Sequence, residues 1–439
     1  MKNAWKGAAI AIVVTAALTL AGCSNPGTGT TTTGTSKWPA ENASLKGTTL
    51  TLWAATNDTP IPKTVVAGFE KLTGATVKVV TIPDPYEQSV QTKIATGDKP
   101  DLAFWQPTAS ELTSLNAKQN LIPLTGAPWI SKVKPALQNI TGILDKTRYA
   151  ALISTPALEG VYYNKEVFTK EGITTLPTNW NDFVALAAQL KAKGVTPFYE
   201  MGGDKWATQW WVQVQLADAA KTGLWDKINS NTEKFSDPTV LSAIKNYKTL
   251  IDDGYFNKDI KTGTFVDQGN ALLGGKVAMV MQVNSFFTEL QASANTATLN
   301  SKIGFFPIST TGNLATSIPD QSNSLVAFNT GNAKQESASR QFLEYWMGSG
   351  YKGFINSVNT VSLETAVADP SGVPTALQDV AKALPTSVGS MQSLAVANPD
   401  LYIYLDDMIQ GTKTPADVAN ATQQQFAQLA KAEGVKAFQ

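Results

Sequence analysis

The residues able to do chemistry in this chain are carboxylates, amides, hydroxyls and aromatic side chains. The sequence of 439 residues contains no histidine and a single cysteine, Cys23. A histidine-based catalytic triad, a histidine-ligated metal and an internal disulfide are therefore excluded. Eleven tryptophans and eleven tyrosines supply flat apolar faces with a polar edge. This set of side chains favours binding over catalysis, and we expect the protein to contain no metal and no other cofactor.

Polar and aromatic side chains stand where several predicted strands end. In an open parallel sheet, residues past the carboxyl ends of the strands line a common crevice. The strands expected at 48–53, 76–82 and 100–105 place these residues at that edge: Asn57, Asp58, Glu87, Trp105 and Gln106. Two later strands, ending near 200 and 282, are followed by five more: Asp204, Trp206, Gln209, Asn284 and Phe286.

These residue types fit a sugar ligand. A sugar has an apolar ring face, which a tryptophan covers, and a rim of hydroxyls, which short polar side chains satisfy.

Each of these positions also has a purely structural interpretation. Trp105 fits a core position, and the acids Asp58 and Glu87 fit solvated loops. Packing within a helix also explains tryptophans in the segment 200–211.

The elements that must position these residues are strands alternating with helices. Between residues 48 and 105 the hydrophobic pattern reads strand, helix, strand, helix, strand. This order at this spacing predicts a parallel sheet with right-handed crossovers. The pattern recurs from Gly160 onward, and the chain is mainly helical after Ala333. A body of about 400 residues exceeds one ordinary core, so we expect an α/β protein with two lobes.

The N-terminus has the layout of an export signal. Lys2 and Lys6 precede an uncharged apolar run that is short for a membrane-spanning helix. The following residues, Leu-Ala-Gly-Cys, resemble a bacterial lipobox, in which the cysteine is lipidated. We therefore expect a signal peptide over 1–22, a lipidated Cys23 and a flexible tether over 23–44. The alternative is an ordinary signal peptide that happens to carry a cysteine.

The charge of the chain argues against a nucleic-acid partner. Thirty-five basic residues balance 35 acidic ones. Only two of the basic residues, Arg148 and Arg340, are arginines, which phosphate recognition favours.

Several motifs, taken together and in order, resemble one family. They include "LTLWAATND", "GFEKLTGATVKV", "IATGDKPDLAFW", "GVYYNKEVF" and "GKVAMVMQVNSF", and the resemblance covers nearly all of the chain after Leu45. The chain resembles the extracellular solute-binding proteins of family 1, the carbohydrate receptors of ABC importers, which include maltose-binding protein. The resemblance implies that Trp105 stacks on sugar and that Glu87 contacts it. It also implies that Phe286 stands where the family often has tryptophan.

The resemblance further implies a periplasmic-binding-protein-like fold with hinge-linked lobes and a ligand cleft between them. Lobe 1 would comprise 45–155 and 323–356, and lobe 2 would comprise 157–319 and 362–439. The implied partners are a sugar, a membrane permease and its ATPase subunits. We expect a monomer anchored by lipid to the extracellular face of the cell membrane.

Two other functions remain open from the sequence. A surface carbohydrate-active enzyme would also use tryptophans and carboxylates, although no acidic pair is placed to act as a dyad. The same receptor could instead carry a peptide, a polyamine or phosphate. A polyamine would need more acids in the cleft, and a phosphate would favour arginines or a Gly/Ser-rich helix start.

Overall fold

The computed structural model describes residues 38–439 except 84–85, without the side chain of Asn57. The predicted signal peptide, Cys23 and residues 23–37 of the predicted tether lie outside the described residues, as does the side chain of Asn57. Residues 38–44, the end of the predicted tether, are held by the body of the protein. Gln341 Nε2 donates hydrogen bonds to the carbonyls of Glu41 (3.0 Å) and Ala43 (2.7 Å).

The first sheet contains five strands in the order β2-β1-β3-β12-β6. β1 pairs in parallel with β2 and β3, which confirms the parallel arrangement expected for these strands. β12 pairs antiparallel with both β3 and β6, so the sheet is mixed. Its strands are β1 (Thr49–Ala54), β2 (Thr76–Thr81), β3 (Leu102–Phe104), β6 (Ala150–Leu152) and β12 (Ser324–Ala327).

The second sheet is built around β7. One edge of β7 pairs antiparallel with β9, and the other edge pairs with β11 and then with β10. β8 and β13 extend the sheet in parallel to β9 and β11. Its strands are β7 (Ala157–Asn164), β8 (Thr196–Phe198), β9 (Val277–Gln282), β10 (Ile303–Phe306), β11 (Thr316–Ile318) and β13 (Val388–Gly389). A separate hairpin consists of β4 (Ile143–Leu144) and β5 (Thr147–Arg148).

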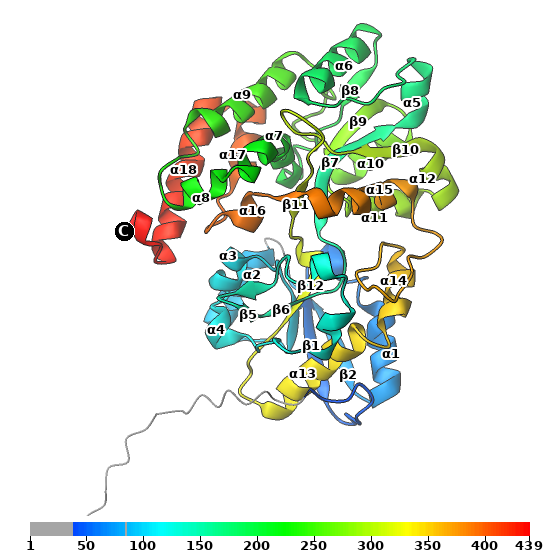
Figure 1. Ribbon diagram of the computed structural model, residues 1–439, viewed down its shortest axis with the longest axis vertical. Coiled ribbons are helices and arrows are strands. Elements are labelled where there is room, and N and C mark those ends of the chain that lie inside the picture. The colour runs from blue at the N-terminus through cyan, green and yellow to red at the C-terminus, as the bar shows by residue number, and fades with distance from the viewer. Residues whose placement is uncertain (1–37, 84–85) are drawn as a thin grey trace, which may run out of the picture. The chain divides into compact units, whose positions relative to one another are not determined.

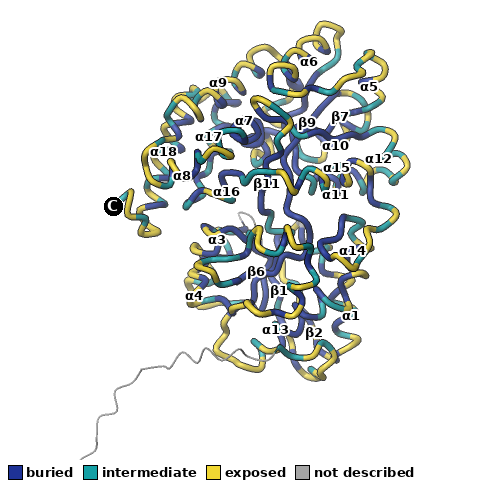
Figure 2. Tube along the Cα trace, viewed as in Figure 1, coloured by how far each residue is buried: buried dark blue, intermediate teal, exposed yellow. Residues whose placement is uncertain are grey.

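Helices cover both faces of each sheet, and the central strands β1, β3, β7 and β9 are largely buried, whereas the edge strand β2 is mostly exposed (Figures 1 and 2). In β1, Leu50 and Leu52 face α1, α13 and α14, whereas Trp53 faces α2 and α3. This alternation is the period of two expected for a strand that is covered on both sides. The helices around the first sheet are α1 (Lys63–Thr73), α2 (Tyr86–Ala95), α3 (Ala109–Ser114), α4 (Ala117–Asn120), α13 (Ala333–Trp346) and α14 (Tyr351–Val358).

The second sheet is also covered on both faces. Tyr162 of β7 packs toward α11, and Val161 packs toward α6 and α7. The helices around this sheet are α5 (Lys165–Lys170), α6 (Trp180–Ala192), α7 (Trp210–Lys221), α8 (Leu224–Asn229), α9 (Pro238–Asp252), α10 (Phe265–Leu273), α11 (Phe286–Ser293), α12 (Thr296–Lys302), α15 (Thr375–Ala383), α16 (Met391–Leu394), α17 (Leu401–Gln410) and α18 (Pro415–Ala432).

Short 3-10 helices complete the described elements. They are η1 (Thr56–Asp58), η2 (Pro128–Lys132), η3 (Pro135–Leu137), η4 (Trp206–Gln209), η5 (Gln321–Asn323), η6 (Leu384–Thr386) and η7 (Lys436–Phe438).

The chain passes between the two sheets three times, after β6, after β11 and after α14. The beginning of the third passage is bonded to the loop that precedes β4. Thr365 N donates to Lys132 O (3.0 Å) and Lys134 N donates to Leu363 O (2.8 Å). Residues 362–365, expected in lobe 2, are therefore bonded to residues 132–134 of the expected lobe 1.

A buried arginine fixes the loop between η3 and β6. The Arg148 guanidinium donates to the carbonyls of Gln138, Thr141 and Ala150. Replacing Arg148 with methionine keeps a long apolar side chain but removes all three donors. We expect Arg148→Met to lower the free energy of unfolding by about 2 kcal/mol, because the buried carbonyl of Ala150 and the half-buried carbonyls of Gln138 and Thr141 lose a donor, and an unpaired buried group costs about 1–3 kcal/mol.

Urea unfolding measures this effect. Arg340→Met is the matched control, because Arg340 is half-buried and has no hydrogen bond among the described residues comparable to those of Arg148. The control should change the free energy of unfolding by only about 0.5 kcal/mol. Equal losses in both variants would contradict the role given to Arg148.

Candidate functional site

The predicted polar residues of the first sheet meet beside Tyr86. Tyr86, at the start of α2, donates from its hydroxyl to Phe104 O (2.8 Å) and lies 3.3 Å from Trp53 O, which ties the helix to the ends of β3 and β1. The next residue, Glu87, accepts a hydrogen bond at Oε1 from Gln106 Nε2 (3.1 Å). The structure therefore brings two of the predicted site residues into direct contact.

Asp58 belongs to the same group. It is 5% exposed and accepts a hydrogen bond at Oδ2 from Gln321 Nε2 (3.3 Å), which comes from the second passage between the sheets. Burial, followed by the charges of Asp58 and Glu87, raises the pKa of the Tyr86 hydroxyl well above its usual value. Asp58 and Glu87 thus face the same tyrosine.

Trp105 is a packing residue in this structure. Its side chain is fully buried, its Nε1 donates to Glu111 O (2.9 Å), and its ring lies 6.3 Å from that of Tyr86. The ring is therefore covered in this conformation, and its stacking on sugar stays a prediction. The physical reason is that α3 covers the ring immediately after the strand ends.

Glu111 lies beside the same residues, although sequence analysis did not select it. Burial, followed by the charge of Glu87, raises the pKa of the Glu111 carboxyl to about 7. Hydrogen bonds from Ser114 and Asn398 oppose this rise. Asn398 lies in the segment between α16 and α17, and α16 itself contacts α3, so this part of the chain approaches Glu111.

Tyr402 approaches the group from α17. Burial raises the pKa of its hydroxyl, and the charges of Asp400 and Glu87 raise it further. Thr208 Oγ1 donates to Tyr402 O (3.1 Å), which connects η4 to α17.

Trp206, the first residue of η4, is half-buried and packs against Trp210, with ring centroids 6.2 Å apart. It therefore keeps part of its surface accessible beside the same helix.

Two other residues predicted near Trp206 have structural contacts. Asp204 is exposed, and its Oδ2 accepts from Phe265 N (2.6 Å) at the start of α10. Gln209 is 7% exposed, and its Oε1 accepts from Gln213 (3.3 Å) and Gln392 (2.7 Å). These contacts join helices to one another and leave little of Gln209 for a ligand.

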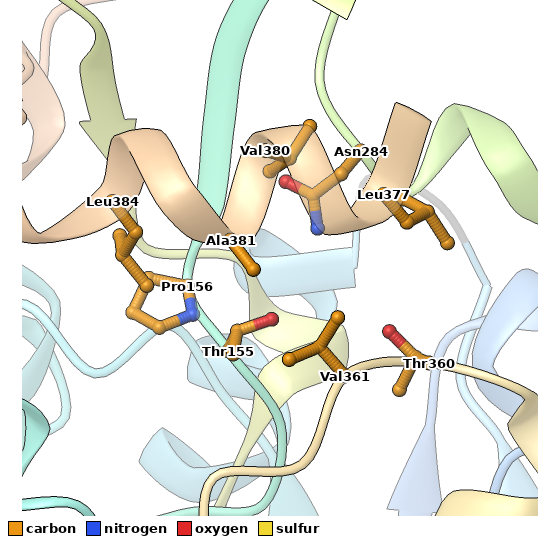
Figure 3. A pocket seen from close by; sticks show the side chains of 9 residues that line it. All are labelled: Thr155, Pro156, Asn284, Thr360, Val361, Leu377, Val380, Ala381 and Leu384. Carbon is orange, nitrogen blue, oxygen red and sulfur yellow. The ribbon is translucent and has the colours of Figure 1, made fainter. Parts of the chain in front are cut away.

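The last two predicted residues lie away from Glu87. Asn284 Oδ1 accepts from Leu158 N (2.7 Å) where β7 begins. It lines a cavity of about 10 Å³, room for a single water at most, with Thr155 and Pro156 (Figure 3). Phe286 is fully buried, with its ring 5.8 Å from that of Tyr162. In this structure Asn284 positions the passage between the sheets, and Phe286 packs in the core.

The arrangement around Glu87 suits recognition of hydroxyl groups. Carboxylate and amide oxygens accept hydrogen bonds, a tyrosine hydroxyl does both, and a partly exposed tryptophan covers an apolar face. Within residues 38–439, leaving out 84–85, no group of three or more acidic or cysteine side chains is placed to hold a metal ion. The helices of that same part of the chain are all too short or too polar to cross a membrane.

The protein contains two mixed β-sheets, each covered by helices, and the chain passes between them three times. This architecture, with polar side chains gathered near the passages, defines a periplasmic-binding-protein fold. The chain belongs to the bacterial extracellular solute-binding proteins, whose family model matches residues 54–353. Members of this family are binding receptors and not enzymes.

Known proteins agree with this assignment. The multiple sugar-binding protein of Streptococcus mutans is 27% identical over 210 residues, covering 46% of this chain and 49% of the relative. The chain thus spans about half the length of the curated relatives it matches.

Among solved structures, a chitin oligosaccharide binding protein has a TM-score of 0.74 at 21% identity, covering 88% of this chain and 99% of the other. The binding protein RafE in complex with raffinose has a TM-score of 0.73 at 21% identity, covering 87% and 99%. At such identity these structures establish the fold alone.

The raised pKa of Glu111 predicts a pH dependence of stability. A carboxyl with a pKa of about 7 in the folded protein and about 4.5 when unfolded binds more protons in the folded state between those values. Its contribution to stability is complete below about pH 4.5 and is lost as the pH rises to 7. Glu111→Gln should therefore flatten the decline in melting temperature between pH 4.5 and 7.

Melting curves across that range test the effect. Burial also raises the pKa of Glu200, Glu364 and Glu433 to about 7, so the variant should reduce the slope without abolishing it. Glu166→Gln, which removes an exposed carboxylate paired with Lys302, is the control and should leave the slope unchanged. An unchanged slope in Glu111→Gln would contradict the prediction.

Proposed function

We propose that this protein is the lipid-anchored, extracellular receptor of an ABC importer and that it captures a neutral di- or oligosaccharide. The observation that carries the proposal is the contact between Glu87 and Gln106 beside Tyr86, faced by Asn398 and Tyr402 from the C-terminal part of the chain. The class of cargo is supported by similar proteins, which include a multiple sugar-binding protein, a chitin oligosaccharide binding protein and RafE in complex with raffinose.

The proposed mechanism is closure of two lobes around the sugar. Lobe 1 would comprise 45–155 and 323–356, and lobe 2 would comprise 157–319 and the C-terminal helices. The contacts of residues 362–365 with residues 132–134 lead us to place the third hinge after Thr365. Ligand that contacts both lobes raises the population of the closed form, which would then dock on the permease.

Individual residues would have distinct parts in recognition. Glu87, Gln106 and Asp58 would accept hydrogen bonds from sugar hydroxyls on one side. Trp206 and Tyr402 would supply the aromatic face on the other, since both keep partial exposure beside η4 and α17. Trp105 would act indirectly, by holding α3 and therefore Glu111 in place.

A cationic cargo is the second candidate. The structure brings the carboxyl groups of Asp58, Glu87 and Glu111 to one region, which would suit an amine such as a polyamine. Against it, the raised pKa keeps a fraction of Glu111 neutral near pH 7. A sugar needs no net negative charge, so we prefer the neutral cargo.

Anchoring is proposed from the sequence alone. The residues Leu20, Ala21 and Gly22 precede Cys23 as they do in bacterial lipoproteins. A lipid on Cys23, followed by residues rich in threonine and glycine, would hold a monomeric receptor near its permease.

Melting temperature against a panel of ligands tests the function. We would compare raffinose, chitin oligosaccharides, maltose and glucose with spermidine and phosphate. A ligand that binds only the folded state adds about 2.7 kcal/mol at a hundredfold excess over its Kd. We expect a shift with one sugar that is not consumed, and loss of that shift in Glu87→Ala and Trp206→Ala.

Asp98→Ala, which removes an exposed acid of the first lobe, is the matched control and should keep the sugar shift. A shift with spermidine alone would replace the sugar by the cationic cargo. Turnover of the sugar, or full shifts in both site variants, would contradict the receptor and its site.

A further inference from the structure

The first sheet has a second end, opposite to the one that carries Glu87 and Gln106. The parallel strands β1, β2 and β3 all begin at this end, and the antiparallel strand β12 finishes there. Gln335, in the first turn of α13, donates from Nε2 to Thr49 O (2.8 Å) and to Asp101 Oδ1 (3.2 Å). These contacts bring the segments that precede β1 and β3 together with the start of α13.

Lysines gather where these segments meet. One lies just before β1, against Gly74; one is in the last turn of α1; one precedes β3; and one is in the first turn of α13. Three of them are exposed, and the lysine before β3 is half-buried. With a neighbouring leucine of α1, which is 43% exposed, they form what we call the basic edge: Lys46, Lys71, Leu72, Lys99 and Lys334.

The acidic residues nearby do not neutralise these lysines. Asp98 is paired with Lys93 (2.8 Å), and Asp101 is only 6% exposed. Glu70 and Glu336 are half-buried, and each accepts a hydrogen bond from a backbone N–H group. None of the four lysines makes an ion pair within the part of the chain that the structure describes. The basic edge therefore presents positive charge to its surroundings.

Helix stability accounts for only part of the basic edge. Lys71 is at the carboxyl end of α1, where the helix dipole favours a cation. Lys334 stands in the first turn of α13, where the dipole disfavours one. Leu72 lies off the buried stripe of α1, which is formed by Val65 and Phe69. The capping and packing of these helices thus explain neither Lys334 nor Leu72.

The position of the chain's N-terminal part relates this surface to the proposed anchor. Lys46 follows Trp38, the first described residue, by eight positions, and Leu45 N donates to Thr73 O (2.8 Å) at the end of α1. Cys23, the proposed site of lipidation, is 15 residues before Trp38, a length of chain that spans at most about 55 Å. A lipid on Cys23 would therefore keep the basic edge within reach of the membrane surface.

We propose that the basic edge rests on an anionic lipid surface. The negative potential of such a surface attracts lysines, and an exposed leucine enters the boundary between head groups and acyl chains. Lysine ammonium groups suit a diffuse charge of this kind, whereas arginine, which the basic edge lacks, suits an individual phosphate. The inference deepens the proposed anchoring, because the folded body contacts the membrane as well as the lipid.

Contact through the basic edge leaves the candidate site accessible. Glu87 and Gln106 follow the carboxyl ends of β2 and β3, whereas the basic edge lies at the amino ends of the same strands. Figure 1 shows β2 and α13 at the end of the molecule that is farthest from the second sheet. A receptor that rests in this way holds its first sheet on the lipid and keeps the Glu87 group turned away from it.

Flotation with vesicles tests the contact. The protein is residues 24–439, which lack Cys23 but retain the compact unit 38–439, so binding does not depend on a lipid anchor. We expect flotation with vesicles of phosphatidylglycerol and phosphatidylcholine at low salt. We expect none with phosphatidylcholine alone or at high salt, because salt screens the attraction.

Charge reversal locates the contact. Lys46→Glu/Lys334→Glu changes two exposed lysines and should weaken binding to the anionic vesicles by about tenfold. Lys245→Glu/Lys258→Glu is the control, because it makes the same change of charge at exposed positions beside the second sheet. The control should bind like the unchanged protein.

A fluorescent label reports the contact directly. Residues 24–439 contain no cysteine, so Leu72→Cys and Val266→Cys each provide a single labelling site. Val266 is 50% exposed in α10 and serves as the control. On anionic vesicles, the emission of an environment-sensitive label should shift to the blue at position 72 and stay unchanged at position 266.

Absence of binding to the anionic vesicles at low salt would overturn the inference. Equal weakening in the two lysine variants, or equal blue shifts at positions 72 and 266, would also overturn it, because the contact would then lie elsewhere. A full-length chain whose Cys23 carries no lipid would contradict the proposed anchor and leave these results unchanged, so the two proposals fail separately.

Discussion

The passages of the chain between the two sheets are the constraint on which the rest of the structure depends. At the first passage, Ser154 Oγ donates to Asn323 Oδ1 (2.7 Å), which ties it to the second. Leu158 N donates to Asn284 Oδ1 (2.7 Å), which fixes the beginning of β7. α15 lies against Thr155, Pro156 and Val361, with Leu384 beside Pro156 (Figure 3). These few contacts determine where the ends of both sheets stand.

The candidate site follows from that constraint. The second passage carries Gln321, which bonds Asp58, and the third leads to the C-terminal segment that carries Asn398 and Tyr402. Glu111 and Asn398, more than 280 positions apart in the sequence, are thereby close enough for Asn398 to affect the pKa of Glu111. A change in the relative position of the two sheets would separate Asp58 and Glu111 from the C-terminal residues Asn398 and Tyr402. A ligand that contacts both sets of residues would therefore favour one relative position of the sheets.

The sequence predicted the fold class and three strands of the first sheet, β1, β2 and β3, because hydrophobic periodicity carries that information, but it did not predict β6 or β12. It did not predict that β7 pairs antiparallel with β9 and β10, since alternation along a strand does not encode the direction of its neighbours. For the site, the strand-end argument selected Glu87 and Gln106, which share a hydrogen bond in the structure. The same argument could not show that Trp105 turns beneath α3, because side-chain direction there depends on the packing of the next helix.

Other site residues had no signal in the sequence at all. Glu111 lies in a short polar helix, and only its burial next to Glu87 distinguishes it from an ordinary surface acid. Gln209 was selected from the sequence, but its bonds to Gln213 and Gln392 could not be, because they depend on α7 and α16 meeting in space. Contacts of this kind arise from tertiary packing and leave no periodic pattern.

Small-angle X-ray scattering of the protein, with and without the sugar that raises its melting temperature, tests the central claim most directly. Closure around a ligand held by both lobes predicts a smaller radius of gyration at saturation, and Glu87→Ala should remove that change at the same sugar concentration. A saturating sugar that leaves the radius of gyration and the scattering profile unchanged would contradict closure as the mechanism.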